Sequence, residues 1–512
     1  MAVVLAIDAG TTGVRTIAFD GTGRPVDTAY RELTQHFPRP GWVEHDPAEI
    51  WAQVAATLAE VTGRMQETPA AIGITNQRET ALAWDRRTGR PLQRAIVWQD
   101  RRTAARCEEL EAAGHLPTIR RKTGLVLDSY FSATKWEWLL GPGGVGAQQD
   151  PAAALALGTV DSWVLWNLTG GPTGGVFATD PSNASRTLVY DIRTGAWDDE
   201  LTELFGLPTG SLPEVLPSSG RVGTTPGGIG GVPKGIPVAG IAGDQQAALF
   251  GQACFSAGMT KNTYGTGSFV LMNVGAECPE PAEGLLTTVA WDLGRDHGSG
   301  PVYALEGAVF VTGAALQWLR DGLGIIDSAA DAGPLAAGIP GADGVYFVPA
   351  LAGLGSPWWD PDARGVITGI TRGSGRAHLV RAAVEAMAYQ SRDVVEAMSR
   401  AAGRQVEEMR VDGGASVMDV LLQLQADQLR VPVARADVVE TTARGAAWLA
   451  GVAEGVWGGT DELARQWSAA AVFRPSDQPD EVTGQGAGQA ADPAHAGWTR
   501  AVERARGWAR RG

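Results

Sequence analysis

Two segments far apart in the chain carry the residue types that hold a polyphosphate. Residues 6–15 read AIDAGTTGVR, and residues 262–269 read NTYGTGSF. Each segment places glycines and threonines between two apolar runs, which predicts a strand, a tight turn and a second strand. Glycine lets backbone amides approach a phosphate closely, and threonine adds a hydroxyl donor or a metal contact. The two segments together therefore indicate the two halves of one phosphate clamp.

A carboxylate precedes the second segment in a setting that favours catalysis. Asp244 lies in the run Gly-Asp-Gln-Gln at 243–246. An isolated aspartate after a strand is more often a helix N-cap than a catalyst. Here the glycine before it gives room, and two glutamines after it add uncharged hydrogen-bonding groups. A bound alcohol is a poor nucleophile, so a carboxylate that accepts its proton would assist attack on phosphorus. The pattern predicts phosphoryl transfer from a nucleotide.

A second group of candidates could bind the alcohol. Arg78 and Glu79 follow an apolar run at 70–76 that reads as a buried strand. The plain alternative is a solvated surface ion pair, but carboxyl ends of buried strands are where open α/β sheets place ligand groups. Arginine donates to hydroxyls and glutamate accepts from them, which suits a neutral polyol. Trp98, Tyr130 and Phe269 would each read as core residues, yet together they could form the apolar wall of a small pocket.

The bulk composition narrows the class of protein. The chain has 512 residues, a net charge of −15 and a pI near 5.0, which argues against nucleic acid or an anionic membrane as its main partner. Such a length suggests two large domains or three smaller ones. Three scattered cysteines without Cys-x-x-Cys spacing, the absence of a leader pattern and the lack of a long apolar run predict a cytoplasmic protein without membrane insertion. The six histidines show no metal-ligand spacing.

Local patterns predict the following elements along the chain. We expect strands at 70–76, 94–98, 183–190 and 408–411, and helices from Asp46 to Gly63, at 379–402, from about Val417 and at 444–452. Residues 208–237 read as irregular loops, and a second α/β unit is expected to begin near Ala239. The domain division is expected at 251–258. Residues 475–494 read as a mobile connector before a short basic helix at 498–511.

Longer stretches of the chain resemble the FGGY family of carbohydrate kinases, over residues 4–474. The matching runs are PGWVEHDP at 40–47, IGITNQRET at 72–80, IVWQ at 96–99, FSATKWEW at 131–138, GDQQAALFGQ at 243–252 and KNTYGTG at 261–267. No Walker A pattern is present. The resemblance implies an α/β protein of two actin-like (ribonuclease H-like) domains with a cleft between them, as in the sugar kinase/Hsp70/actin superfamily. Residues 1–250 would bind glycerol and phosphate, 251–474 the nucleotide, and 475–512 would be a connector and terminal helix.

Within this family the chain is most similar to members that phosphorylate glycerol, which implies a reaction and a set of roles. ATP would give its γ-phosphoryl group to the 3-hydroxyl of glycerol, forming sn-glycerol 3-phosphate in glycerol catabolism, with Asp244 as general base. Glycerol would contact Arg78, Glu79, Trp98, Tyr130, Asp244, Gln245 and Phe269. The nucleotide would contact Thr11, Thr12, Gly13, Arg15, Gly265, Thr266, Gly313, Gln317, Gly414 and Met418. Asp8, with Asp244 nearby, would support Mg²⁺, and the assembly would be a homodimer or homotetramer.

The chain departs from the family pattern in places that bear on nucleotide binding and control. Ala9 replaces a usual glutamine, and Met418 replaces an asparagine that reaches the nucleotide; a thioether cannot replace both donor and acceptor. Residues 231–237 have glycine where relatives inhibited by fructose 1,6-bisphosphate have arginine. Other relatives are activated by phosphorylation of a histidine in that general region, and none of the six histidines of this chain lies there. The surface that binds a sugar-transport protein in some relatives falls near 475–494. We therefore expect none of these three controls to operate.

Two other functions compete with this interpretation. The closer one is an FGGY kinase for a pentulose or another polyol, although Arg78, Glu79 and Trp98 favour the smaller substrate. The other is a nucleotide-driven conformational protein of the Hsp70 or actin type, which would need neither the Asp244–Gln245 pair nor the aromatic pocket. A substrate panel separates the first from our interpretation, and ATP hydrolysis independent of glycerol would identify the second.

Overall fold

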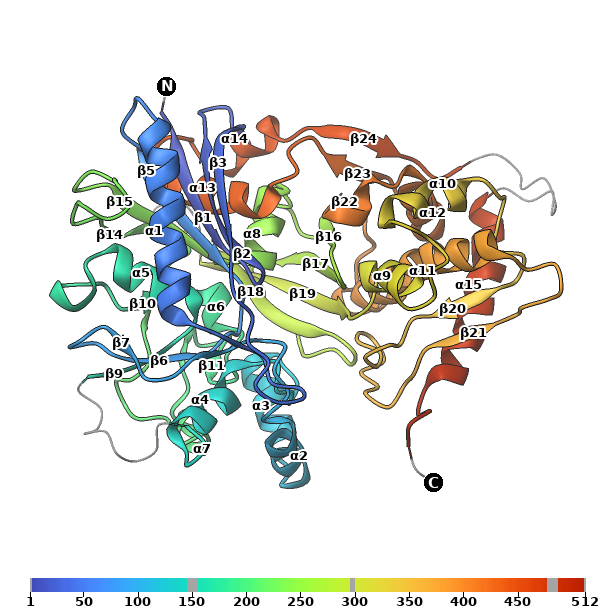
Figure 1. Cartoon of the computed structure of the whole chain (residues 1–512), viewed down its shortest axis with the longest axis horizontal. Helices are drawn as coiled ribbons and strands as arrows, with labels where there is room; N and C mark the ends of the chain where they lie inside the picture. The colour runs from blue at the N-terminus through green and yellow to red at the C-terminus, as the bar shows by residue number, and fades with distance from the viewer. Residues whose placement is uncertain (1, 145–153, 295–299, 477–486, 511–512) are drawn as a thin grey trace.

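The computed structural model describes residues 2–144, 154–294, 300–476 and 487–510, and it contains two large mixed β-sheets with helices on their faces (Figure 1). The first sheet has six strands in the described part of the chain. In spatial order they are β14 (Ser219–Thr224), β15 (Pro237–Gly243), β5 (Ala71–Asn76), β1 (Val4–Ala9), β2 (Gly13–Phe19) and β3 (Pro25–Glu32).

The second sheet has seven strands among the described residues and lies in the second half of the chain. In spatial order they are β18 (Leu286–Asp292), β19 (Pro301–Val309), β17 (Ser268–Gly275), β16 (Thr260–Tyr264), β22 (Met409–Asp412), β23 (Val433–Ala436) and β24 (Ala469–Phe473). Short ladders flank the two sheets: β4 (Glu44–His45) with β8 (Ala95–Ile96), β7 (Arg90–Pro91) with β6 (Leu82–Asp85) and β9 (Leu155–Gly158), β10 (Ala178–Thr179) with β13 (Glu214–Val215), β11 (Tyr190–Asp191) with β12 (Ala196–Trp197), and β20 (Tyr346–Val348) with β21 (Val366–Thr368).

Both glycine/threonine segments form the strand–turn–strand units that the sequence predicts. Strands β1 and β2 pair antiparallel from Val4–Phe19 to Ala9–Val14, and β16 pairs in the same way with β17. Each hairpin has a parallel strand beside its first strand, β5 next to β1 and β22 next to β16. The two sheets therefore repeat one local arrangement around each predicted phosphate bend.

Helices cover both faces of the sheets. Those of the first half are α1 (Pro47–Arg64), α2 (Ala104–Ala112), α3 (Leu116–Thr123), α4 (Ser132–Leu140), α5 (Val160–Leu168), α6 (Pro181–Ala184), α7 (Asp199–Leu204) and α8 (Asp244–Gly251). Those of the second half are α9 (Gly313–Asp321), α10 (Ala332–Ala337), α11 (Arg376–Ala402), α12 (Asp419–Leu429), α13 (Thr441–Ala453), α14 (Thr460–Gln466) and α15 (Ala487–Ala505). Short 3₁₀ turns cover Gly171–Thr173, Ala329–Asp331 and Gly414–Val417.

Alternate side chains of β1 enter two different cores. Leu5 and Ile7 pack in a cluster with residues of α1 and α5, whereas Val4 and Ala6 pack with residues of α13 on the opposite face. This follows from the two-residue period of a strand. A central strand buried on both faces reads as a continuous apolar run, as this one does.

Helix α13 joins the two halves of the molecule. It belongs to the second half of the chain, yet it packs on β1, β5 and β15 of the first sheet and against α8 (Figure 1). A Cβ on Gly251 would lie 1.9 Å from the Thr441 carbonyl oxygen, and one on Gly445 would lie 1.8 Å from that of Ala247. The backbones of the two helices are therefore in direct contact, an approach that only glycine permits.

Several expected elements differ from the structure. Residues 183–189 are not a strand, and of the expected range only Tyr190 belongs to one, β11. The Asp180 carboxylate accepts from the backbone N–H groups of Ser182 and Asn183 and starts α6. The loop region 208–237 contains the edge strand β14, and the strand at Ala239 belongs to the first sheet, so no second unit begins there. The helix expected from Val417 begins as a 3₁₀ turn, with α12 following from Asp419.

The C-terminal region also differs from expectation. Helix α15 begins at Ala487 and continues past Pro493, so the last part of the expected connector is helical. Residues 477–486, the middle of that connector, lie outside the described residues. The Asp393 carboxylate accepts hydrogen bonds from His495 Nε2 and Trp498 Nε1, at 2.7 and 2.8 Å, and so fixes α15 on α11. Among the described helices, none has the length and apolarity to cross a membrane.

Candidate active site

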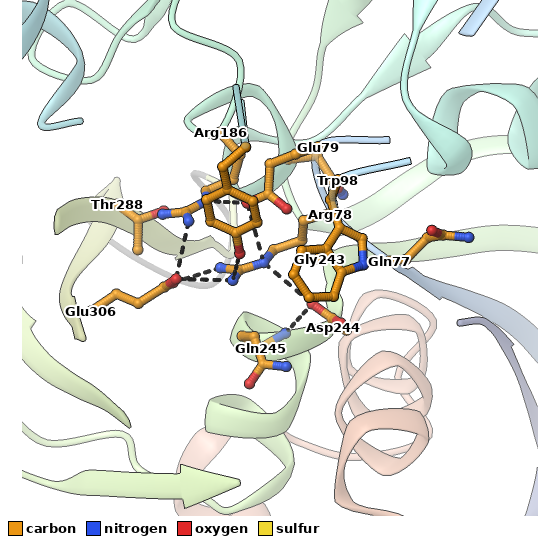
Figure 2. A network of polar contacts seen from close by, with 12 residues as sticks. Gln77, Arg78, Glu79, Trp98, Arg186, Gly243, Asp244, Gln245, Thr288 and Glu306 are labelled. Atoms are coloured by element: carbon orange, nitrogen blue, oxygen red, sulfur yellow. Dashed lines mark hydrogen bonds and ion pairs between the residues drawn. The ribbon is translucent and has the colours of Figure 1, made fainter. Parts of the chain in front are cut away.

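The carboxyl ends of two paired strands bring the predicted alcohol-binding residues together. Strands β5 and β15 run parallel and end side by side at Asn76 and Gly243. Arg78 follows the first and Asp244 the second, and the Arg78 Nε atom lies 3.2 Å from Asp244 Oδ1. Figure 2 shows these two side chains pointing toward each other. Asp244 begins α8 with about a third of its side chain exposed, so the carboxylate is accessible to a substrate while its position is fixed.

Arg78 is part of a closed, buried network of charges. Its two terminal nitrogens donate to both carboxylate oxygens of Glu306 on β19, at 2.6 and 2.9 Å. Arg186 donates to Glu79 Oε1 at 2.6 Å and to Glu306 Oε1 at 3.0 Å (Figure 2). All four side chains are at most 2% exposed. Two cations and two anions compensate one another, which is the condition under which buried charges are tolerated.

Two members of this network, Arg186 and Glu306, were not among the residues predicted from the sequence. The predicted pair Arg78–Glu79 exists, but at 3.6 Å it is looser than the contact that each residue makes elsewhere. Glu306 had a detectable signal, because it is the one charge within the otherwise uncharged strand β19. A glutamate in such a strand is seldom buried without a cationic partner.

Two opposing effects set the pKa values of the carboxyl groups in this network: burial raises them, and the two guanidinium groups lower them. Burial alone would raise the pKa of Glu306, but Arg186 and Arg78 outweigh it and hold this pKa at about 2. Burial raises the pKa of Glu79 despite both arginines. Burial likewise raises the pKa of Asp244, with Arg78 and Lys261 acting in the opposite direction. A carboxylate with a raised pKa is a better proton acceptor than an ordinary surface aspartate.

The three predicted aromatic residues lie beside this network and come from both halves of the chain. The Trp98 ring meets Tyr130 at 5.6 Å and Phe269 at 6.4 Å between centroids, both edge to face. Arg78 donates to the Tyr130 hydroxyl at 3.2 Å, and its guanidinium lies 5.8 Å from the Phe269 ring centre. Phe269 belongs to β17 of the second sheet. The aromatic wall therefore contains residues from both halves of the molecule.

The first phosphate bend is tied to the same wall. The turn closes through a hydrogen bond from Gly10 N to the Gly13 carbonyl, and a Cβ on Gly13 would lie 2.4 Å from the Tyr30 ring. Trp98 Nε1 donates to the Thr11 hydroxyl at 2.9 Å. Thr12 is exposed. Through Trp98, residues predicted to bind phosphate and residues predicted to bind the alcohol are in direct contact.

A hydrogen bond from Gln77, which was not among the predicted site residues, also holds the first bend in place. Gln77 Nε2 donates to the Gly10 carbonyl at 3.1 Å and lies 3.2 Å from His45 Nδ1. Burial lowers the pKa of His45 to about 4, so this ring is neutral at pH 7. Arg15, predicted to contact phosphate, forms an ion pair with Glu440 at 2.9 Å and is half-exposed. Its guanidinium therefore lies at the surface next to the bend.

Asp8 is the next-to-last residue of β1, close to the bend, and is a candidate for holding a cation. Burial raises its pKa to about 7, with Arg15 opposing and Asp244 and Glu440 adding to the rise. A bound cation would favour the charged form of a carboxylate held in this way. The described residues contain no cluster of three or more His, Cys, Asp or Glu side chains able to hold a metal. The Asp8 carboxylate, with Asp244 nearby, fits an ion that keeps most of its water or takes phosphate oxygens.

The second bend forms one wall of a cavity of about 690 Å³. All six nucleotide-binding residues predicted in the second half line it: Gly265, Thr266, Gly313, Gln317, Gly414 and Met418. The bend docks on the start of α9, since Gly313 N and Ala314 N donate to the Gly265 and Thr266 carbonyls at 3.1 and 3.0 Å. A Cβ on Gly313 would lie 2.6 Å from the Gly265 carbonyl oxygen.

The cavity has a lining unlike the charged network. Besides the bend, it consists mostly of small or apolar residues of α9, α10, α12 and the 3₁₀ turns Ala329–Asp331 and Gly414–Val417: Leu316, Ala329, Ala330, Gly333, Pro334, Ala337, Ala415, Val417 and Val420. Arg320 and Asp419 are the charged residues of its lining in the described chain. Such a space is suited to a flat, largely uncharged group at the end of a chain of phosphates.

The two mixed sheets, the paired bends and the buried network define a two-domain α/β sugar kinase fold. Models of the FGGY family of carbohydrate kinases match twice: the N-terminal domain over residues 3–251 and the C-terminal domain over residues 260–454. The chain belongs to the FGGY family of carbohydrate kinases. This confirms the resemblance and the fold class predicted from the sequence.

Similar proteins cover nearly the whole chain. "Glycerol kinase" of Carboxydothermus hydrogenoformans is 51% identical, covering 99% of this chain and 98% of its own, and "Glycerol kinase 2" of Thermotoga maritima is 52% identical over all of both. The crystal structure of Plasmodium falciparum glycerol kinase with ADP is 33% identical with a TM-score of 0.91, covering 99% and 98% of the two chains. A xylulose kinase from Lactobacillus acidophilus, at 20% identity and a TM-score of 0.87 over 98% and 97%, shows the same fold.

Proposed function

We propose that this chain transfers the γ-phosphoryl group of ATP to the 3-hydroxyl of glycerol, giving sn-glycerol 3-phosphate and ADP. The observation that carries the proposal is the placement of Asp244. Its accessible carboxylate lies 3.2 Å from the buried Arg78, and the aromatic wall beside Arg78 is hydrogen-bonded to the first phosphate bend. The curated relatives at about half identity over the full chain carry the name glycerol kinase, which supports the choice of alcohol.

In the proposed site, each group of residues has a separate task. Arg78, Glu79, Tyr130 and Gln245 bind the hydroxyls of glycerol, while Trp98 and Phe269 cover its carbon atoms. Asp244 orients the 3-hydroxyl and accepts its proton as the oxygen attacks the terminal phosphorus. Arg186 and Glu306 hold Arg78 and Glu79 in place, so that binding glycerol requires little reordering of side chains.

In the proposed site, the phosphates and the adenosine of ATP bind in different places. Thr11, Thr12, Gly13 and Arg15 contact the phosphates from one side, and Gly265 with Thr266 from the other. The adenosine enters the cavity bordered by Gly313, Gln317, Gly414 and Met418. In domain terms, residues 1–250 bind glycerol and phosphate, and residues 251–474 bind the nucleotide.

A magnesium ion completes the proposed site. Asp8, with Asp244 nearby, would hold it mainly through water, because Mg²⁺ in kinases is bound by one or two carboxylates plus substrate phosphates. When bound, the ion supplies positive charge that offsets the charge developing on the phosphoryl oxygens.

Coupled measurement of ADP release, with and without glycerol, tests the proposed function. We expect release to depend on glycerol, to need Mg²⁺ and to yield one ADP per glycerol 3-phosphate. A panel with xylulose, ribulose and erythritol should show a much lower kcat/KM for each. If a pentulose is preferred, the substrate assignment is wrong; if ADP appears at the same rate without any alcohol, the protein is a nucleotide-driven ATPase instead.

Two further parts of the proposal concern the whole protein. We infer a homodimer or homotetramer in the cytoplasm, because relatives that phosphorylate glycerol form such assemblies, and the cysteine pattern suits a reducing compartment. Fructose 1,6-bisphosphate should not inhibit it, since residues 231–237 lack an arginine. Sedimentation velocity and an inhibition curve test these two statements, and inhibition at micromolar concentrations would contradict the second.

A further inference from the structure

Lys261 is a buried lysine beside the proposed site that no part of the mechanism above uses. It lies on β16, in the strand that leads into the second bend, and is 0% exposed. Its Nζ atom donates to the side-chain oxygen of Gln245 and, at 2.9 Å, to the Thr263 hydroxyl. Lysine is almost never fully buried unless its charge is compensated. The position therefore calls for an explanation in terms of its partners.

The contact with Gln245 decides which way that amide faces. An ammonium group has only donors, so the amide oxygen must be the atom that faces Lys261, and the NH₂ group faces the other way. Within the described residues, Gln245 Nε2 has no hydrogen-bond partner, and it is not among the fully buried unsatisfied atoms. The NH₂ group is thus free to donate to a bound molecule.

The charges around Lys261 explain why an ammonium ion is kept there. Burial lowers its pKa to about 8, while Asp412 on β22 and Asp244 on α8 raise it, Arg78 lowers it and Glu306 raises it. The Asp412 carboxylate already accepts hydrogen bonds from Gln252 Nε2 and the Thr441 hydroxyl, at 2.8 and 2.6 Å. The surroundings therefore favour a cation without offering Lys261 a direct carboxylate partner, which leaves its donors for Gln245 and Thr263.

A second buried lysine beside the site provides a contrast. Lys135 is also 0% exposed, and its Nζ atom donates to the backbone carbonyls of Glu79 and Tyr130. A backbone carbonyl cannot exchange places with an NH₂ group as the oxygen of a side-chain amide can, so Lys135 fixes the path of the main chain. Lys261 instead holds a side-chain amide, whose two ends would otherwise exchange places at little cost.

We propose that Lys261 is a positioning residue that fixes the Gln245 amide with its NH₂ group toward the hydroxyls of the substrate. The site then offers glycerol a donor from Gln245 and acceptors from Asp244 and Glu79. Lys261 acts through Gln245 and does not itself touch the alcohol. This inference rests on the proposed function, because it assigns the NH₂ group to a substrate hydroxyl.

A double-mutant cycle between Lys261→Met and Gln245→Ala tests the proposal. Each single change should raise the KM for glycerol about tenfold, with kcat and the KM for ATP changed less than threefold. In the Gln245→Ala background, Lys261→Met should add no further increase, because the amide that it positions is gone. Lys234→Met, which alters an exposed lysine, serves as the matched control and should behave as the wild type.

A second variant keeps the proposal testable if Lys261→Met does not fold. Gln245→Glu retains an acceptor for Lys261 but has no NH₂ group, so it should raise the KM for glycerol as much as Gln245→Ala does. A wild-type KM in Gln245→Glu, or fully additive effects in the cycle, would overturn the assignment. Failure of the proposed function is distinct, since the wild type would then show no glycerol-dependent ADP release.

Discussion

The two regions of the proposed site differ in how they are built. The alcohol side is a buried network of charges in which Arg78, Glu79, Arg186 and Glu306 are each at most 2% exposed. The nucleotide side is a cavity of about 690 Å³ lined mostly by glycine, alanine and other small or apolar residues. In the proposed function, the first would recognise its ligand through directed hydrogen bonds, and the second through shape and backbone groups.

This difference predicts different sensitivity to substitution. Removing one member of a buried charge network leaves its partners uncompensated, which costs several kcal/mol. Removing one side chain from an apolar cavity removes only a small part of the van der Waals contact with the ligand. Changes within the buried charge network should therefore affect glycerol binding and stability together, whereas changes on the nucleotide side should affect the KM for ATP alone.

The largest effect is expected from Asp244→Ala. Without the carboxylate that accepts the proton, kcat should fall at least about a hundredfold. Nucleotide binding should survive, because the cavity that would hold adenosine does not include this residue. Steady-state kinetics and calorimetric titration with ATP measure the two quantities. Near-normal turnover would remove Asp244 from the role of base.

Glu306→Gln tests the charge network itself. Arg78 and Arg186 would lose the carboxylate they share, so we expect the free energy of unfolding to fall by about 3 kcal/mol and the KM for glycerol to rise. Glu280→Gln is the matched control, because Glu280 pairs with Arg193 at the surface with 84% of its side chain exposed and should cost less than about 1 kcal/mol. If urea unfolding shows equal losses of the free energy of unfolding in the two variants, the contrast between the buried and the exposed charges is wrong.

Gly313→Ala probes the nucleotide side. The new Cβ would lie 2.6 Å from the Gly265 carbonyl oxygen and would push the second bend away from α9. We expect the KM for ATP to rise about tenfold, the equivalent of 1.4 kcal/mol, while the KM for glycerol stays within a factor of two. Gly63→Ala, where the Cβ would meet nothing within 4 Å, should leave both constants unchanged. A selective loss of glycerol affinity in Gly313→Ala would contradict the division between the two regions.

The smallest effect is expected from Met418→Asn. Met418 borders the cavity and is 8% exposed, and an amide there adds a donor and an acceptor that a thioether lacks. The KM for ATP should fall about threefold, within the range of one added hydrogen bond, with kcat unchanged. A higher KM for ATP would show that the apolar lining, and not a missing polar contact, determines nucleotide affinity.

The parts that sequence predicts well are those whose determinants are local. Gly10, Gly13 and the threonines define the first bend within a few residues, and β1 with β2 forms the expected hairpin. The resemblance to the FGGY family likewise indicated residues that the structure brings together around one cavity.

The parts that could not be predicted depend on contacts between distant segments. Arg78 meets Glu306 across 228 residues of sequence, and Arg186 meets it across 120. Neither partner carries a local motif, and Arg186 follows the residues 183–184 of α6, which were expected to form a strand. Lys261 was part of a recognised motif, but its contact with Gln245 depends on how β16 lies beside α8.

The central claim is that Asp244 activates one hydroxyl of glycerol beside the terminal phosphate of ATP. ³¹P NMR of a reaction with Mg²⁺, ATP and glycerol tests it most directly. We predict that the γ-phosphate signal is replaced, in equal amount, by the phosphomonoester signal of glycerol 3-phosphate, and that this conversion is nearly abolished in Asp244→Ala. The appearance of inorganic phosphate in place of the ester, or an unchanged rate in the variant, would contradict the account.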